Sequence, residues 1–375
     1  MAKKKKIRLE FRKNQQSRTR SNDLTKRFDQ SQNDDGMIST ERISGKGDLT
    51  RKRTVIGLEA EGAEQGVVLE IDTSVCRAGR VLSAHGLTTT VRDDQGNIFE
   101  CATSRVLKSL TTDLRHAVVT GDCVWFRPMG ETEGMIERVE PRRSALSRAS
   151  RGRKHVIVSN VDQLLIVVSV AEPALKPHLI DRYLISAEQG RLDAIICLNK
   201  IDLVDVAELQ PLVGVFSQMG YRVVLTSAQT GQGVAELRRM IQGKETVLSG
   251  QSGVGKSSLL NVVQPGLGLR VSHVSAENQK GRHTTTVAQL IPLEAGGYMV
   301  DTPGIRAFEL WDVSSAEVSS FFRDLRPFVN HCRYPNCTHR HETDCAVKDA
   351  VADDLLDARR YESYLHVYDG TMPPG

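Results

Sequence analysis

The sequence predicts a multidomain protein in which a small β-barrel is followed by a parallel α/β domain and a short α-helical domain. Three observations carry this prediction. Short alternating runs of polar and apolar residues fill 66–140, apolar runs alternate with helical patterns over 156–310, and cysteines and histidines crowd into 311–375. The length of 375 residues suits two or three domains.

The first 54 residues are predicted to form a disordered basic tail. They are rich in Lys, Arg, Ser, Gln and Asp and show no sustained apolar period. Residues 1–28 carry eleven Lys or Arg against two acidic residues, whereas the whole chain has 50 basic and 46 acidic residues. The rest of the chain is therefore mildly acidic. A basic arm on an acidic body indicates a polyanionic partner such as nucleic acid.

The composition excludes several classes of protein. A hydrophobic fraction of 39% with 26% charged residues is typical of a globular protein with a large core. The longest apolar run, 164–171, is too short to span a bilayer, and the charges of Arg8, Glu10 and Arg12 interrupt any signal peptide. Seven cysteines, an odd number, argue against a secreted disulfide framework. We expect a cytoplasmic protein without a membrane partner.

The segment 66–140 is predicted to form an OB-type β-barrel. Turn signals at 94–97 and 120–122 separate short alternating runs that are typical of strands. These runs are 66–71, 80–82, 88–92, 97–101 and 123–127. Five short strands suit an OB-type barrel, and an SH3-like barrel is the alternative that strand spacing leaves open.

An arginine-rich linker, 141–155, is expected before a doubly wound α/β domain that spans 156–310. Strand-like runs are found at 164–170, 194–198, 222–225, 246–248, 287–293 and 298–300. Helical patterns are found at 178–189, 205–219, 233–242 and 256–263. This alternation is typical of a parallel sheet covered by helices.

A phosphate-binding loop is indicated at residues 250–257, GQSGVGKS, which match GxxxxGK[ST] between a strand and a helix. Backbone amides of such a loop cradle phosphates, Lys256 would reach the β- and γ-phosphates, and the Ser257 hydroxyl would bind Mg²⁺. A chance glycine-rich turn is the alternative, and the flanking strand and helix disfavour it. The candidate residues are Gly250, Gln251, Ser252, Gly253, Val254, Gly255, Lys256, Ser257 and Ser258.

A second motif, Asp301-Thr-Pro-Gly304, ends the strand-like run 298–300. The Asp301 carboxylate is expected to hold Mg²⁺, and the Gly304 amide to contact the γ-phosphate. By itself this motif fits a simple turn. Its position after the phosphate-binding loop favours the nucleotide reading.

A guanine-recognition motif, NKxD, is present at Asn199, Lys200 and Asp202. The Asp202 carboxylate can accept two hydrogen bonds from the guanine N1–H and exocyclic amine, the Lys200 stem can pack over the base, and Asn199 can tie this loop to the phosphate-binding loop. Ser227 and Ala228 follow the next strand, where a backbone contact to the guanine O6 is expected. Together the four motifs predict GTP or GDP with Mg²⁺ as the bound cofactor.

The order of these motifs narrows the identification. In ordinary small GTPases the phosphate-binding loop precedes NKxD, whereas here NKxD precedes the loop, which is a circular permutation. The sequence resembles the ribosome small-subunit-dependent GTPase A family of bacterial assembly factors. The resemblance covers about 66–365 and includes GQSGVGKSS, GRHTTT, DTPGIRAF, the barrel and the C-terminal cysteines. It implies a circularly permuted GTPase that acts in late maturation of the 30S subunit, binds rRNA in the GTP state and leaves after hydrolysis.

The resemblance also points to the threonine run at 284–286 as the switch. Thr285 and Thr286 are the candidates for the Mg²⁺ ligand and the γ-phosphate contact, and the motif leaves their roles interchangeable. Ile305 stands where related enzymes carry a water-orienting Gln. His283 is the candidate replacement, acting with Lys256 and Thr285 in catalysis. The alternative for His283 is a solvated loop residue.

The C-terminal domain is predicted to bind one structural zinc ion. Three thiolates and one imidazole form a closed tetrahedral ligand set that leaves no position for water. The ligands are Cys332, Cys337, His339 and Cys345. His331 and His341 are close enough in the sequence to compete, and three reduced thiols without a metal are the alternative.

Two functions remain open from the sequence. The first is a monomeric GTP hydrolase that acts on the small ribosomal subunit and its rRNA, with the barrel and basic tail as RNA contacts. The second is a non-catalytic RNA-binding assembly or translation regulator in which GTP is a structural switch. Lys256, Ser257 and Asp301 favour the enzyme, and Ile305 favours the regulator.

Overall fold

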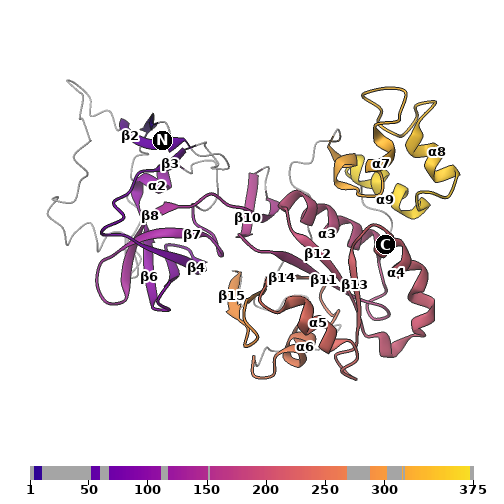
Figure 1. Ribbon diagram of the computed structural model, residues 1–375, viewed down its shortest axis with the longest axis horizontal. Coiled ribbons are helices and arrows are strands. Elements are labelled where there is room, and N and C mark those ends of the chain that lie inside the picture. Colours follow the sequence, from indigo (N-terminus) through magenta and orange to yellow (C-terminus); the bar gives the residue numbers. More distant parts are fainter. Residues whose placement is uncertain are drawn as a thin grey trace. The chain divides into compact units, whose positions relative to one another are not determined.

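The computed structural model describes most of the chain. The described residues are 4–10, 52–59, 67–110, 117–150, 153–267, 288–301, 315 and 317–371. These residues form two compact units. The first contains the described residues up to 145 and those within 150–160 and 287–290, and the second contains the other described residues. Figure 1 shows the elements of both units.

The first unit contains a five-stranded barrel. Its elements are β4 (Arg77–His85), β5 (Thr88–Asp93), β6 (Ile98–Thr103), α2 (Arg105–Leu110), β7 (Cys123–Pro128) and β8 (Glu133–Val139). The strand order is β4-β5-β6-β8-β7, and β7 pairs again with β4, which closes the sheet. Strands β6 and β8 run parallel, and the other neighbours run antiparallel. This is the order of an OB fold, so the OB prediction is confirmed and the SH3-like alternative is wrong.

Alternating apolar residues fill the barrel. The Phe99 and Phe126 rings pack with their centroids 4.9 Å apart. Four further members of this apolar cluster are fully buried: Val81, Val91, Cys101 and Ile136. Burial of one large apolar side chain contributes about 1.5–3 kcal/mol, so this cluster stabilises the barrel.

The fifth barrel strand differs from the one that the sequence suggests. The run 66–71 contains β3 (Val67–Leu69), which pairs with β2 (Lys52–Glu59) and lies outside the barrel order. Strand β8 takes its place. Its alternation is interrupted by Gly134, where a Cβ atom would lie 2.9 Å from the Phe126 ring. Close packing therefore requires a glycine, and a glycine weakens the sequence signal of a strand.

The N-terminal tail contains a strand at each of its described ends. Strand β1 (Lys4–Glu10) pairs antiparallel with β2, with Lys4 opposite Leu58 and Glu10 opposite Lys52. The expectation of a tail without regular structure over 1–54 is therefore wrong for 4–10 and 52–54. Ile7 and Leu9 alternate with charged residues, which is the period-two pattern of a strand. The prediction of disorder rested on the many charged residues and overlooked this short pattern. Residues 11–50 lie outside the described part of the chain.

A buried carboxylate holds the segment that follows β8. Asp122 is fully buried and accepts hydrogen bonds from Arg142 Nε at 2.7 Å and from Ser159 Oγ at 2.6 Å. A buried charge is costly unless it is paired, so these contacts keep the segment against the barrel. The expected linker 141–155 is thus partly ordered as strand. Its strands are β9 (Ala145–Ser150) and β10 (Arg153–Ser159).

The second unit contains a parallel five-stranded sheet in the order β13-β12-β11-β14-β16. The strands are β11 (Gln163–Ser169), β12 (Asp193–Asn199), β13 (Arg222–Thr226), β14 (Glu245–Ser249) and β16 (Tyr298–Asp301), and β15 (Gln289–Pro292) precedes β16. All seven residues of β11 are buried, so both faces of the sheet are covered. The predicted doubly wound α/β fold is confirmed.

The helices of this unit follow the strands that the sequence predicts. They are α3 (Pro177–Gly190), η1 (Ile201–Leu203), η2 (Val206–Leu209), α4 (Gln210–Gln218), α5 (Val234–Ile241) and α6 (Lys256–Val263). Helices α5 and α6 pack on one face through Leu237 and Leu259, which meet Val167 and Cys197 of the sheet. Helix α3 contacts β11 and β12.

Residues 317–371 form a small helical module, called the C-terminal module below. Its elements are η3 (Val318–Phe321), α7 (Arg326–Val329), α8 (Ala346–Ala352) and α9 (Ala358–Tyr368). Its apolar cluster includes Phe322, Leu325, Cys345, Val347 and Tyr364. Cys332 and Cys337 pack against this cluster, so the core of the module and its cysteines are in contact.

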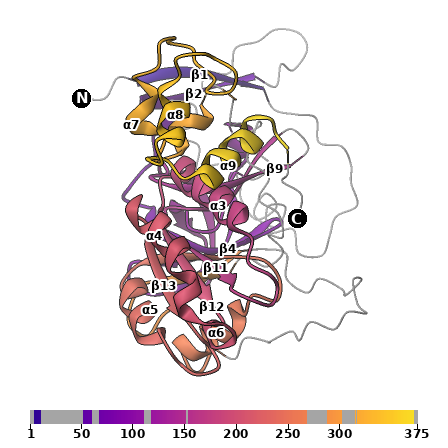
Figure 2. The same cartoon turned by 90° about the vertical axis from the view of Figure 1, so that its right-hand side faces the viewer.

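Helix α9 of the C-terminal module lies beside α3 (Figure 2). Asp181 of α3 is fully buried, and Arg360 of α9 is 1% exposed, with the Arg360 Nη1 and Asp181 Oδ1 atoms 2.7 Å apart. Arg360 also donates to Asp324 at 2.8 and 2.9 Å, and Ser363 Oγ donates to Asp181 at 2.5 Å. Loss of one partner would leave a buried charge uncompensated, so this cluster specifies how the module docks on α3.

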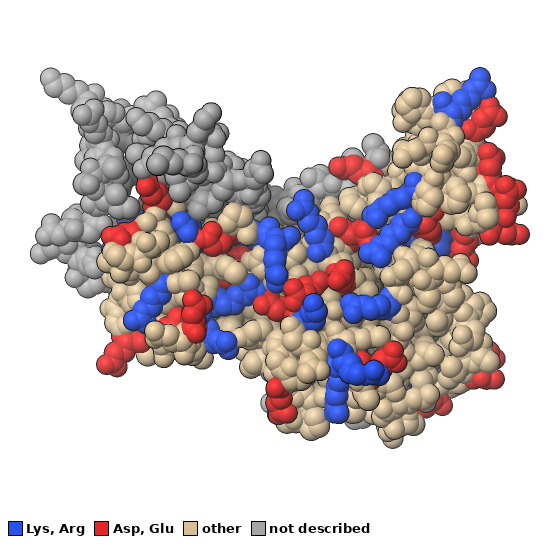
Figure 3. Space-filling model, viewed as in Figure 1, with Lys and Arg blue, Asp and Glu red and all other residues tan. Residues whose placement is uncertain are grey.

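Basic and acidic side chains are interspersed on the face seen in Figure 3. Exposed acidic residues on α8 and directly after it include Asp349, Asp353 and Asp354. Most of the basic residues of the N-terminal arm lie outside the described residues. Within the described part of the chain, no helix combines the length and apolar character that a membrane span requires.

Candidate functional site

The predicted nucleotide-binding residues meet at one edge of the parallel sheet. Strand β12 ends at Asn199, β13 ends at Thr226, and β14 ends at Ser249 directly before the phosphate-binding loop. The backbone of Asp301, at the end of β16, pairs with Leu248. Because parallel strands place their carboxyl ends at the same edge, ligands of such sheets bind there.

Glycines shape the phosphate-binding loop. Gly250, Gly253 and Gly255 have φ angles of 148°, 85° and 91°, in the region that favours glycine. A Cβ on Gly250 would lie 2.1 Å from the Val167 carbonyl oxygen, and a Cβ on Gly255 would lie 2.6 Å from Asn199 Nδ2. These positions therefore require glycine for space as well as for conformation.

Helix α6 begins at Lys256, so its N-terminal amides lie at the loop. The amides and the helix dipole favour an anion at this point. Lys256 Nζ donates to the carbonyl oxygens of Gly250 at 2.8 Å and Gln251 at 2.6 Å. The ammonium group thus already lies over the loop that would hold the phosphates. Ser252 is exposed, while Ser257 and Ser258 are partly buried at the start of the helix.

The guanine-recognition motif is joined to the phosphate-binding loop by a hydrogen bond. Asn199, which is 1% exposed, donates from Nδ2 to the Val254 carbonyl oxygen at 2.8 Å. Lys200 has a φ of 67° and donates from Nζ to the Glu172 carbonyl oxygen, and Asp202 is exposed. The Asp202 carboxylate is therefore accessible to a base.

The loop after β13 is shaped by a buried hydroxyl. Ser227 is fully buried, and its Oγ accepts hydrogen bonds from the Gln229 N–H at 3.2 Å and the Thr230 N–H at 3.0 Å. Ala228 is partly buried beside it. The Ser227 side chain thus orders the loop, and the predicted base contact would fall to backbone groups.

A substitution of Gly255 tests the contact between the two loops. Gly255→Ala is expected to lower the affinity for GDP by at least about tenfold, because the new methyl would displace the Asn199 amide and small displacements of positioned groups are costly. Gly266→Ala is the matched control, since Gly266 has a φ of 104° but faces open space. Calorimetric titration with GDP measures both variants. Equal losses of affinity would mean that backbone strain, and not the Asn199 contact, explains the effect.

Several predicted residues cannot be placed. His283, Thr285, Thr286 and Gly304 lie outside the described residues, as does Ile305. For Asp301 the structure describes the backbone alone. The described residues therefore include the predicted base-binding loops and the predicted phosphate-binding loop.

The four predicted metal ligands converge in the C-terminal module. The Sγ atoms of Cys332, Cys337 and Cys345 and a ring nitrogen of His339 all lie within 4.8 Å of one another. Cys332 Sγ and Cys345 Sγ lie 3.4 and 3.5 Å from His339 Nδ1, and 3.9 Å from each other. Ligands around a tetrahedral zinc ion are separated by about 3.5–3.8 Å, given zinc–ligand bonds of about 2.0–2.3 Å. The donor set thus fits one tetrahedral ion.

Neighbouring side chains hold the ligand loop in shape. Glu342 accepts hydrogen bonds from the Thr338 N–H at 2.7 Å and the Arg340 N–H at 2.9 Å. Burial alone would raise the pKa of Glu342, but the hydrogen bonds from Thr338 and Arg340 hold this pKa below its usual range. Tyr361 donates to the His339 carbonyl oxygen at 2.6 Å. His331 and His341 are exposed and lie outside the cluster.

Sequence reasoning missed residues that position others. Thr226 bonds to Asn199, and Glu342 and Tyr361 support the metal loop. For Thr226 a signal was present, because it directly precedes Ser227 and Ala228. Glu342 and Tyr361 act on backbone groups, which leave no motif in the sequence.

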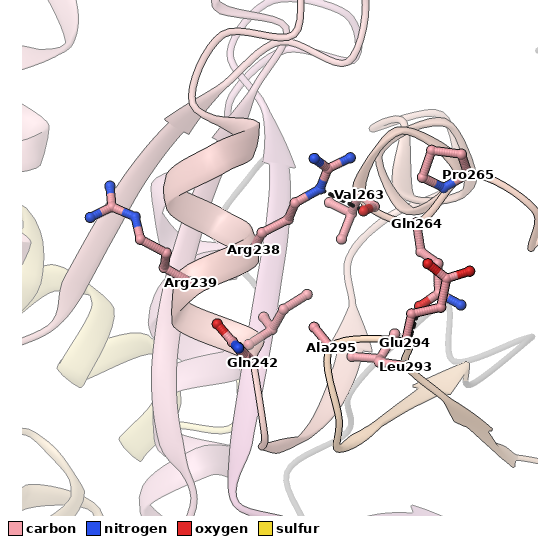
Figure 4. Close-up of a pocket in the computed structure, with 10 residues that line it drawn as sticks. Arg238, Arg239, Gln242, Val263, Gln264, Pro265, Leu293, Glu294 and Ala295 are labelled. Carbon is pink, nitrogen blue, oxygen red and sulfur yellow. Dashed lines mark hydrogen bonds between the residues drawn. The ribbon is translucent and has the colours of Figure 1, made fainter.

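A separate pocket lies at the far end of α6 from the phosphate-binding loop (Figure 4). Its lining includes Arg238, Val263, Gln264 and Leu293. Arg238 donates from Nε to the Val263 carbonyl oxygen at 2.6 Å, so its charge caps the C-terminus of the helix. None of the predicted site residues lines this pocket.

The chain is similar to a family of bacterial proteins. The family profile described as RsgA GTPase matches residues 139–311. A small ribosomal subunit biogenesis GTPase RsgA of Thermotoga petrophila is 38% identical over 301 residues, which cover 79% of this chain and 97% of that relative. The protein of the same name from Chromohalobacter salexigens is 40% identical over 299 residues, covering 78% of this chain and 86% of the relative.

Solved structures agree with these similarities. The crystal structure of YjeQ from Thermotoga maritima matches with a TM-score of 0.66 and 34% identity, covering 80% of this chain and all of that one. The structure of YloQ, described as a circularly permuted GTPase, matches with a TM-score of 0.62 and 26% identity over 82% of this chain. The architecture described above is thus shared with solved structures over most of its length.

Proposed function

The chain belongs to the RsgA GTPase family, and from this premise we propose that it hydrolyses GTP in late maturation of the small ribosomal subunit. The observation that carries the guanine-nucleotide site is the Asn199–Val254 hydrogen bond, which joins the base-binding and phosphate-binding loops at the carboxyl edge of the sheet. The names of the relatives support the small subunit as partner. We propose that rRNA is bound in the GTP state and released after hydrolysis.

The proposed roles of the site residues follow from their chemistry. Asp202 reads the base, the loop amides and Lys256 hold the phosphates, and Lys256 stabilises the charge that develops on the γ-phosphoryl oxygens. Ser257, Thr285 and Asp301 are proposed to hold Mg²⁺, with Thr286 and Gly304 contacting the γ-phosphate. When bound, this ion would neutralise charge on the β- and γ-phosphates.

Ordering of the switch threonines by the ribosomal subunit is proposed to set the rate. GTP turnover is therefore expected to be slow for the protein alone and at least about tenfold faster with purified small subunits, since a partner that completes the catalytic site raises turnover. Phosphate release with and without subunits measures this. Large subunits are the control, and equal rates in all three conditions would contradict the proposal.

His283 is proposed to orient the attacking water, because Ile305 cannot hydrogen-bond. His283→Ala is expected to lower subunit-stimulated turnover by about 10²-fold, within the range of general acid–base catalysis, while GDP affinity is retained. Single-turnover hydrolysis with subunits measures the first quantity and calorimetry the second. Full stimulated turnover in this variant would remove His283 from the mechanism.

A non-catalytic regulator is the second candidate, and Ile305 in place of a water-orienting Gln is the observation that favours it. In that case a single-turnover assay with small subunits would show bound GTP that stays intact. Release of phosphate under the same conditions would exclude it.

We propose zinc as the ion of the C-terminal module, because three thiolates and one imidazole are its preferred structural ligands. Its ligands are Cys332, Cys337, His339 and Cys345. The proposed OB-fold contact with rRNA is supported by the frequent use of this barrel for nucleic acids, and the basic N-terminal arm would add phosphate contacts. Action as a monomer in the cytoplasm completes the proposal.

A further inference from the structure

A buried chain of hydrogen bonds lies behind the guanine-recognition motif. Asn199 is registered with Thr226 across β12 and β13, and Cys197 lies two residues before Asn199 on the same face of β12. The three side chains are 0–1% exposed. Thr226 Oγ1 lies 3.2 Å from Asn199 Oδ1 and 3.1 Å from Cys197 Sγ. These groups are buried from bulk solvent and hydrogen-bond to one another.

The direction of each hydrogen bond follows from the inventory of donors. The Val254 carbonyl oxygen can only accept, so the Asn199 atom that faces it at 2.8 Å is the NH₂ group. The other arm of the amide is then the oxygen Oδ1, which can only accept. Thr226 must donate its single hydroxyl proton to this oxygen.

That assignment decides the role of the thiol. Since the Thr226 proton is already used, the contact between Thr226 Oγ1 and Cys197 Sγ requires the S–H group to donate. Burial raises the pKa of Cys197 to about 12, so the thiol keeps its proton at neutral pH. The chain therefore runs in one direction, from Cys197 through Thr226 and Asn199 to Val254.

We propose that Cys197 is a positioning residue for guanine-nucleotide binding, whose thiol acts through Thr226 to lock the Asn199 amide in the orientation that joins the predicted base-binding loop to the phosphate-binding loop. The inference rests on the proposed nucleotide site. If the amide turned over, two oxygens would face each other at Val254 and the link would be lost. The thiol acts at a distance from the nucleotide, through Thr226.

Variants that remove or retain each donor test the proposal. Thr226→Val removes the hydroxyl but keeps the shape, and leaves Asn199 Oδ1 unpaired. It is expected to release N-methylanthraniloyl-GDP about tenfold faster, and Cys197→Ala about threefold faster, as the loss of one buried neutral hydrogen bond predicts. Thr226→Ser and Cys197→Ser retain a donor and are expected to return the release rate to within about twofold of the unmodified protein. Stopped-flow fluorescence on the full chain measures the release.

A matched control separates positioning from stability. Cys101→Ala removes another fully buried thiol, in the barrel core, where burial also raises the pKa to about 12. Its thermal unfolding is expected to shift like that of Cys197→Ala, but its release rate should not change. In steady-state hydrolysis, Cys197→Ala and Thr226→Val should raise KM for GTP and leave kcat unchanged, which a purely structural defect would not do.

The outcomes distinguish the two levels of the proposal. If the unmodified protein binds the fluorescent nucleotide and Cys197→Ala releases it at the rate of Cys101→Ala, the thiol has no positioning role. If Cys197→Ser fails to restore what Cys197→Ala loses, the donor argument is wrong. Absence of binding to the unmodified protein would instead contradict the nucleotide site itself.

Discussion

Removal of the proposed zinc ion by a chelator is expected to unfold the C-terminal module. Three thiols and an imidazole lie within 4.8 Å of one another, and Cys332, Cys337 and Cys345 all belong to or pack against the apolar cluster of the module. Structural zinc in small domains contributes about 10–16 kcal/mol, so its removal is expected to cost the module a large part of its stability. Hydrogen exchange with mass spectrometry should show lost amide protection over 317–371 after chelation, while β11 and β12 stay protected.

Substitution of one ligand should reproduce this effect. Cys345→Ala is expected to lower the zinc content and the amide protection of the module together, because the ligand lies at the start of α8 and in the apolar cluster. Cys101→Ala in the barrel is the matched control and should retain both. Full protection of 317–371 in protein that metal analysis finds free of zinc would show that the ion has no structural role.

Replacement of Lys256 is expected to lower GTP turnover by about 10²–10³-fold. The ammonium group lies over the phosphate-binding loop, within 2.8 Å of two of its carbonyl oxygens, at the N-terminus of α6. A fixed donor aimed at the charge of a transition state contributes about 2.7–4 kcal/mol. Single-turnover hydrolysis of GTP by Lys256→Ala, with small subunits present, measures the loss.

An exposed lysine at the other end of the same strand provides the control. Lys244 directly precedes β14, whereas Lys256 follows it beyond the loop. Lys244→Ala removes the same charge and should hydrolyse GTP at the unmodified rate. If Lys256→Ala retained more than about a tenth of this rate, the phosphates would be held mainly by backbone amides.

The parallel sheet was predictable because its strands are long apolar runs that helices separate. Strand β11 is buried along its whole length, and its sequence is accordingly continuous in apolar residues. Strand β8 was missed because Gly134 interrupts its alternation, although the Phe126 ring leaves no room for a larger residue. Strand β1 was missed because its charged residues dominate a short period of two. A strand that is buried on both faces of a sheet has a continuous apolar run in its sequence, and such a run is easier to recognise than the short alternation of a strand with one buried face.

The residues of the candidate site also fall into a group that the sequence predicts and a group that it does not. Residues of the predicted nucleotide site, such as Asn199 and Lys256, belong to motifs with fixed spacing, so their positions could be read from the sequence. Thr226, Cys197 and Glu342 act on those residues or on their backbone, and their partners are known only when the chain is folded. Their contributions depend on register between strands, which spacing along the chain does not contain.

The order of the strands has a consequence for synthesis on the ribosome. Strand β14 pairs with β11 on one side and β16 on the other, yet it follows β12 and β13 in the chain. Lys256 emerges fifty-seven residues after Asn199, which corresponds to about 3–11 s of translation. During that interval the base-binding half exposes the open edge of β11. We therefore expect the proposed nucleotide site to form on a nascent chain only after β14 has inserted at this edge.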